Sequence, residues 1–117
     1  MSQTALEFRV MTARVGENDY IVTVAGPLDA AATGQFRDSL VRLVRKPGVR
    51  VLVDGLGLSS VEAEAVAALA DAAERAHAGG GEISVVADSL ELVRLLRVTG
   101  LDRLFRVYPS FAEAVRR

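Results

Sequence analysis

Residues 51–69 read VLVDGLGLSSVEAEAVAAL and join two different patterns. The apolar, β-branched run over 49–53 is typical of a strand covered on both faces of a sheet. A short polar loop follows, and then alanine and leucine residues recur at helical spacing, which predicts a helix over 62–78. The inner stripe of this helix consists of Ala65, Leu69, Ala72 and Ala76. Side chains this small would let the helix lie close against the sheet, and Gly79-Gly80-Gly81 would end it.

The start of this helix is the predicted functional surface. Unpaired backbone N–H groups and the positive end of the helix dipole make such a place suitable for an anion, a phosphate or a side chain of a partner. The residues expected there are Ser59, Ser60, Glu62, Ala63, Glu64 and Ala65.

The flanking segments predict an α/β fold. Strands over 6–15 and 20–25, with a turn at 16–19, indicate an antiparallel hairpin. Asp29 is placed to cap a helix that ends near 46–48. Strands over 82–87 and 104–107 then alternate with helices over 89–98 and 110–116, so we expect a single domain over 1–117 with a mixed sheet of about five strands and about four helices.

Composition excludes several classes of function. The 117 residues carry a formal net charge of -1, so no overall field attracts nucleic acid. Without cysteine there is no disulfide, thiolate nucleophile or cysteine metal site. His77 is the only histidine, and no catalytic set or phosphate-binding loop is present. We therefore expect no cofactor, no metal and no enzymatic activity, and a soluble cytoplasmic protein, since neither a signal peptide nor a membrane span is visible.

Several short motifs, in this order of elements, resemble the STAS domain of bacterial anti-sigma-factor antagonists. They are Gly26-Pro27-Leu28-Asp29, Val53-Asp54, Gly79-Gly80-Gly81-Glu82-Ile83 and Val98-Thr99-Gly100-Leu101. The resemblance covers nearly the whole chain and implies a STAS-like (SpoIIAA-like) fold. It also implies a partner that is both an anti-sigma factor and a serine kinase, which binds the unphosphorylated loop before the second helix.

The resemblance breaks at the phosphorylation motif. The family typically has Asp-Ser-Ser-Gly, with the first Ser phosphorylated, where this chain has Glu62, Ala63, Glu64 and Ala65. Ala63 therefore occupies the phosphoacceptor position and has no hydroxyl. The family's Gly-Glu-Leu-Asp also loses its acidic side chain to Pro27 and keeps only Asp29. The resemblance thus implies binding of an anti-sigma factor or kinase-like partner without phosphorylation at the usual position.

The individual residues also have simpler interpretations. Glu62 and Glu64 would complement the helix dipole, and Ser59 with Glu62 has the spacing of a capping box. Ser59 and Ser60 are alternative phosphorylation sites, displaced from the family position. Asp29 would serve as a helix cap, as an interface residue, or as both.

Two other functions stay open. The chain is alternatively a STAS subunit that docks on the ATPase of a membrane lipid or solute transport complex, or a nucleotide-binding sensor domain. Four arginines give the C-terminal part local positive charge, either as a solvated face or as a site for an acidic partner or nucleotide: Arg94, Arg97, Arg103 and Arg106. The first hairpin also offers an edge through which a homodimer would form.

Overall fold

The computed structural model describes residues 7–116, which form one five-stranded sheet with four α-helices and a short 3-10 helix. The elements in chain order are β1 (Arg9–Arg14), β2 (Asp19–Leu28), α1 (Ala30–Val44), β3 (Arg50–Val61), α2 (Ala63–Ala78), β4 (Glu82–Val86), α3 (Leu90–Thr99), η2 (Leu101–Arg103), β5 (Arg106–Tyr108) and α4 (Phe111–Arg116). The strands lie in the order β1-β2-β3-β4-β5. β1 is antiparallel to β2, and every other pair is parallel. The predicted mixed α/β fold is confirmed.

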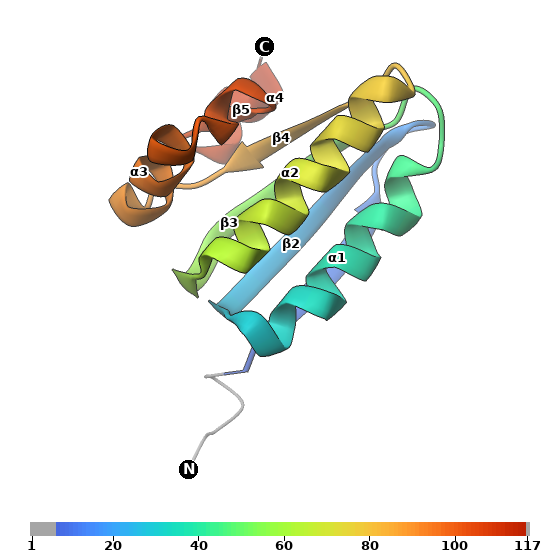
Figure 1. Ribbon diagram of the computed structural model, residues 1–117. Helices are drawn as coiled ribbons and strands as arrows, with labels where there is room; N and C mark the ends of the chain where they lie inside the picture. The colour runs from blue at the N-terminus through green and yellow to red at the C-terminus, as the bar shows by residue number, and fades with distance from the viewer. Residues whose placement is uncertain (1–6, 117) are drawn as a thin grey trace.

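The main core lies between the sheet and the pair α1 and α2, which run side by side across one face (Figure 1). Alternation along β2 turns Val22 and Val24 into this core and leaves Thr23 exposed. Phe36 of α1 is 2% exposed and its ring meets that of Phe8 edge-on, with centroids 6.5 Å apart. The alanine stripe of α2 is buried as predicted, which allows close packing on the strands.

The segment over 54–61 is strand, although its composition predicts a loop. β3 continues to Val61 because β2 continues beside it to Leu28, with Gly26 opposite Leu58 and Leu28 opposite Val61. Two register shifts interrupt this pairing. A Cβ on Gly57 would lie 3.1 Å from the Cβ of Ala25, so glycine permits the close approach of the two strands. Pairing with a neighbouring strand therefore overrides the turn-like composition.

The C-terminal part differs from the prediction by a small shift. The predicted strand over 104–107 is instead Arg106–Tyr108, and η2 fills the space after α3. Ser89 caps α3 by accepting a hydrogen bond from the backbone N–H of Leu92 at 3.3 Å. Gly100 ends that helix with φ 75°, a left-handed conformation that favours glycine.

Candidate functional site

The candidate site lies where β2 and β3 end and α1 and α2 begin. Because the two strands are parallel, both helix starts come to the same edge of the sheet (Figure 1). The backbone N–H of Glu62 donates to the carbonyl of Leu28 at 3.0 Å and joins the two segments. We call this region the helix-start surface and define it by Asp29, Ser59, Ser60, Glu62, Ala63 and Glu64.

Asp29 caps α1, as the sequence predicted. Its Oδ1 accepts a hydrogen bond from the backbone N–H of Ala32 at 3.0 Å, and its carbonyl accepts one from the hydroxyl of Thr33 at 2.9 Å. Asp29 is half-buried, so part of it is accessible from solvent. The cap and an interface role are compatible in this geometry.

Replacing Asp29 with alanine should cost about 1 kcal/mol of the free energy of unfolding, because one N–H of the first turn loses its acceptor. Urea unfolding followed by circular dichroism measures this loss. Asp29→Asn is the matched control, since asparagine caps about as well as aspartate without the charge. If both variants lost equal stability, the charge and not the cap would be the stabilising feature.

The start of α2 has no side-chain cap, so the predicted capping box is wrong. Glu62 is the N-cap residue, with φ -99° and ψ 160°, and its side chain makes no capping hydrogen bond. Ser59 lies in β3, three residues before the cap, because the strand continues to Val61. Ser59 and Ser60 are both exposed. The first N–H groups of α2 are therefore not satisfied by a capping side chain.

The residues after the cap divide between solvent and core. Ala63 is the first residue of α2 and is exposed, as are Glu62 and Glu64. Ala65, in contrast, is 1% exposed and packs in the core. A partner at this surface cannot reach Ala65, so its predicted place among the partner-binding residues is corrected.

Sequence reasoning missed two exposed leucines at the same edge of the sheet. Leu56 is 43% exposed in the second half of β3, and Leu90 is 78% exposed at the start of α3, just after β4. Single exposed apolar side chains are common on protein surfaces, so these leucines add apolar area at this edge without marking a site by themselves. The sequence contained one sign of this: Leu56 stands between Gly55 and Gly57, where a solvent-exposed loop has no need of a large apolar side chain.

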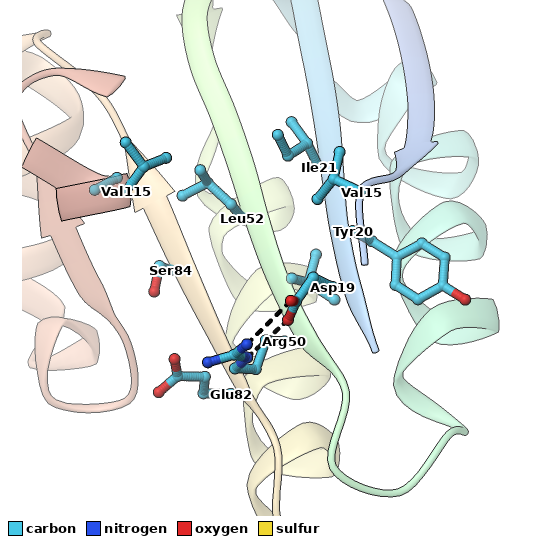
Figure 2. A pocket seen from close by; sticks show the side chains of 11 residues that line it. Val15, Asp19, Tyr20, Ile21, Arg50, Leu52, Glu82, Ser84 and Val115 are labelled. Carbon is cyan, nitrogen blue, oxygen red and sulfur yellow. Dashed lines mark hydrogen bonds and ion pairs between the residues drawn. The ribbon is translucent and has the colours of Figure 1, made fainter. Parts of the chain in front are cut away.

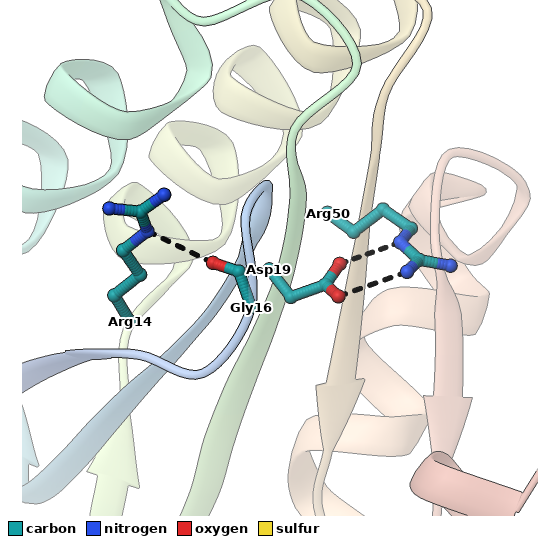
Figure 3. A network of polar contacts seen from close by, with 4 residues as sticks. All are labelled: Arg14, Gly16, Asp19 and Arg50. Atoms are coloured by element: carbon teal, nitrogen blue, oxygen red, sulfur yellow. Dashed lines mark hydrogen bonds and ion pairs between the residues drawn. The ribbon is translucent and has the colours of Figure 1, made fainter.

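A hollow of about 260 Å³ opens at the amino ends of β2, β3 and β4, away from the helix-start surface. It lies on the sheet face opposite α1 and α2. Figure 2 shows Ile21, Leu52, Ser84 and Val115 around it, the last from α4. Its polar end is the ion pair of Asp19 and Arg50, whose two nitrogen-to-oxygen distances are 2.7 and 3.0 Å (Figures 2 and 3).

Asp19 accepts these hydrogen bonds and so raises the pKa of the Arg50 guanidinium. The pair is solvent-exposed, with 60% of the Arg50 side chain accessible, and exposed pairs contribute little to stability. Arg14 holds the neighbouring turn by donating to the carbonyl of Gly16 at 3.0 Å (Figure 3) and to that of Glu17 at 3.2 Å. The contacts of Arg14 hold the turn between β1 and β2, and the ion pair holds the start of β2 beside the start of β3.

Residues 7–116 also bear on metal binding and membrane insertion. They contain no group of three or more His, Cys, Asp or Glu side chains placed to hold a metal ion. None of their helices has the length and apolar character needed to span a bilayer. His77 lies exposed near the end of α2.

The fold defines the class of protein as a mixed α/β domain. Its candidate site lies at the carboxyl edge of the sheet, where the long parallel pair β2 and β3 ends and two helices begin. The family model of the STAS domain matches residues 10–114, and the chain belongs to this family. A comparison with curated proteins finds no match.

Solved structures with the same fold include anti-sigma factor antagonists. The antagonist from Mycobacterium paratuberculosis is 20% identical with a TM-score of 0.81, and the match covers 93% of this chain and 92% of that one. SpoIIAA, a Bacillus cell fate determinant, in its unphosphorylated form is 17% identical with a TM-score of 0.76, covering 92% and 93%. Part of the murine anion transporter Slc26a9 is 23% identical with a TM-score of 0.71, covering 88% of this chain and 18% of the transporter.

Proposed function

We propose that this chain is a non-enzymatic protein-interaction module of the anti-sigma-factor antagonist type. In this proposal it binds an anti-sigma factor or kinase-like partner through the helix-start surface. Binding is not switched by phosphorylation at position 63. The cytoplasmic location expected from the sequence belongs to the same proposal.

The exposure of Ala63 is the observation that carries the proposal. Position 63 is the first residue of α2 and faces solvent, so a partner can reach it. Its methyl group offers nothing to phosphorylate. Position 63 would therefore keep the same chemistry whether or not a kinase is active.

The acidic residues beside Ala63 do not reproduce a phosphorylated surface. A phosphoserine carries about -1.5 to -2 charges on one group. Glu62 is the cap residue and Glu64 follows two positions later, and residues two apart on a helix do not face each other. The family motif already has an acid at position 62, so only Glu64 adds charge. The surface thus corresponds better to the unphosphorylated, binding-competent state.

Incubating the protein with candidate anti-sigma kinases and ATP tests the proposal. We expect no phosphate on the peptide that contains residues 54–65, and partner affinity that is the same with ATP as with a non-hydrolysable analogue. Mass spectrometry locates any phosphate, and calorimetry measures the affinity. Phosphate on Ser59 or Ser60 together with loss of binding would overturn the proposal, since both hydroxyls are exposed.

The fold likeness to Slc26a9 supports a second candidate function. A STAS subunit of a membrane lipid or solute transport complex would use a similar surface to dock on an ATPase. The neighbouring genes discriminate between the two candidates. A permease and an ATPase would favour the transport complex, whereas a kinase-like anti-sigma factor would favour the antagonist.

Self-association through β1 is the remaining part of the proposal. β1 is an edge strand, and no strand within residues 7–116 pairs with its outer side, which a second copy would use. Met11 at its centre is 71% exposed. Arg9 and Arg14 bracket the strand, so a dimer formed through this edge should be weak, because their charges oppose close pairing.

A further inference from the structure

A hollow of about 570 Å³ lies at the C-terminal end of the fold, between α3, η2 and the edge strand β5. We call it the α3–β5 hollow. Its size is within the range of pockets that hold small ligands. Its floor is apolar and includes Leu96 and Phe105, which are 1% and 5% exposed, together with Val107. None of these residues belongs to the helix-start surface.

Two of the four C-terminal arginines line this hollow from different elements. Arg97 comes from the last turn of α3, and Arg106 is the first residue of β5. Asp102 of η2 also lines it, so the lining carries two positive charges and one negative charge. Among the residues that the structure describes, neither arginine takes part in an ion pair. The hollow thus combines an apolar lining with two exposed arginines that form no ion pair, which differs from an ordinary solvated face.

Tyr108 adds an independent observation. It lines the same hollow, and its hydroxyl is buried with no hydrogen-bond partner among the described residues. A buried hydroxyl without a partner is costly and is uncommon in folded proteins. A ligand oxygen in the hollow would become this partner after a turn of the Tyr108 side chain, because the hydroxyl has almost no accessible surface in the unliganded protein.

We propose that the α3–β5 hollow binds a small amphiphilic anion, whose carboxylate or phosphate group meets Arg97 and Arg106 and whose apolar part lies on the partly exposed Val93 and Val107. Guanidinium groups recognise both acid groups through paired hydrogen bonds. A nucleotide fits less well, because the floor is aliphatic and aromatic with no glycine-rich phosphate loop beside it. This site is independent of the proposed partner binding.

Titration of the full chain with octanoate, octyl phosphate and octanol, followed by calorimetry and backbone amide NMR, tests the proposal. Octanoate or octyl phosphate should bind at least about tenfold more tightly than octanol, because a charge-assisted hydrogen bond is lost with the alcohol. The comparison of the two acids tells a fatty acid from a phosphate ester. Shifted amide signals should fall in α3, η2 and β5. Equal binding of octanol, binding of none of the three probes, or tighter binding of ATP or GTP than of either acid would overturn the proposal.

Substitutions separate the arginines of the hollow from their neighbours. Arg97→Gln and Arg106→Gln should each weaken binding of the acid by on the order of tenfold. Arg94→Gln is the matched control, because Arg94 is also exposed on α3 but does not line the hollow. Tyr108→Phe should weaken binding while leaving the unliganded protein folded, since its hydroxyl makes no contact to lose. If all three arginine changes weakened binding equally, the acid would be attracted by the overall positive charge of this region. That result would contradict a specific site in the hollow.

Discussion

Phe36→Ala is expected to lower the free energy of unfolding by about 3–5 kcal/mol, the usual cost of removing a buried phenylalanine ring. Phe36 is 2% exposed and lies between α1 and the sheet. Its edge-on contact with Phe8 also ties the segment before β1 to this helix. Loss of the ring would leave a cavity in the layer that positions the start of α1.

Urea unfolding measures this loss, and Gln35→Ala is the control because Gln35 is the exposed neighbour on the same helix. The control should stay within about 0.5 kcal/mol of the wild type, as most surface changes do. A loss below about 1 kcal/mol for Phe36→Ala would mean that the core collapses around the vacancy or packs differently from the structure.

The sequence predicted the layers well because periodicity reports burial directly. Phe36 and Leu40 on α1 and Val51 and Val53 on β3 are all in the core, whereas Leu52 faces the opposite side of the sheet and is half-buried. Helix ends were predicted where the cap is local: Asp29 and Ser89 each bond to a backbone N–H three residues on. These features depend on residues close in the chain.

The second half of β3 could not be predicted, because its cause is not local. Residues 54–61 have the composition of a loop, and the partner that makes them a strand is the end of β2, more than thirty residues earlier. The same extension moves Ser59 out of the cap position. Ala65 is a different case: it was predicted both on the inner stripe of α2 and among the partner-binding residues, and its burial agrees only with the first.

The α3–β5 hollow shows a different limit. The sequence located positive charge at the C-terminal end, but four arginines at similar spacing look alike. Only the fold separates Arg97 and Arg106, which line the hollow, from Arg94 and Arg103, which do not. The role of an arginine depends on the surface beside it, and that surface is made by β5 and η2.

Ala63→Ser should restore a phosphorylation switch, if the proposed partner binds the helix-start surface. The new hydroxyl would stand on the exposed first residue of α2, within reach of a kinase. Phosphorylation would add about -1.5 to -2 charges beside Glu62 and Glu64. A partner adapted to the uncharged methyl should then bind at least about tenfold more weakly, which corresponds to about 1.4 kcal/mol.

This loss of affinity should occur without a loss of stability. A comparison of partner affinity with melting temperature therefore separates a change at the binding surface from unfolding. A phosphate at a helix N-terminus interacts favourably with the dipole, so the phosphorylated variant should melt no lower than the unmodified one. Ala67→Ser is the control, because Ala67 is also exposed on α2 but lies one turn further along. Calorimetry with the partner and a thermal melt of each form provide the two measurements. Weak binding by the wild type, rescued in the unphosphorylated Ala63→Ser/Glu64→Ser variant, would instead mean that the present surface recognises a different partner.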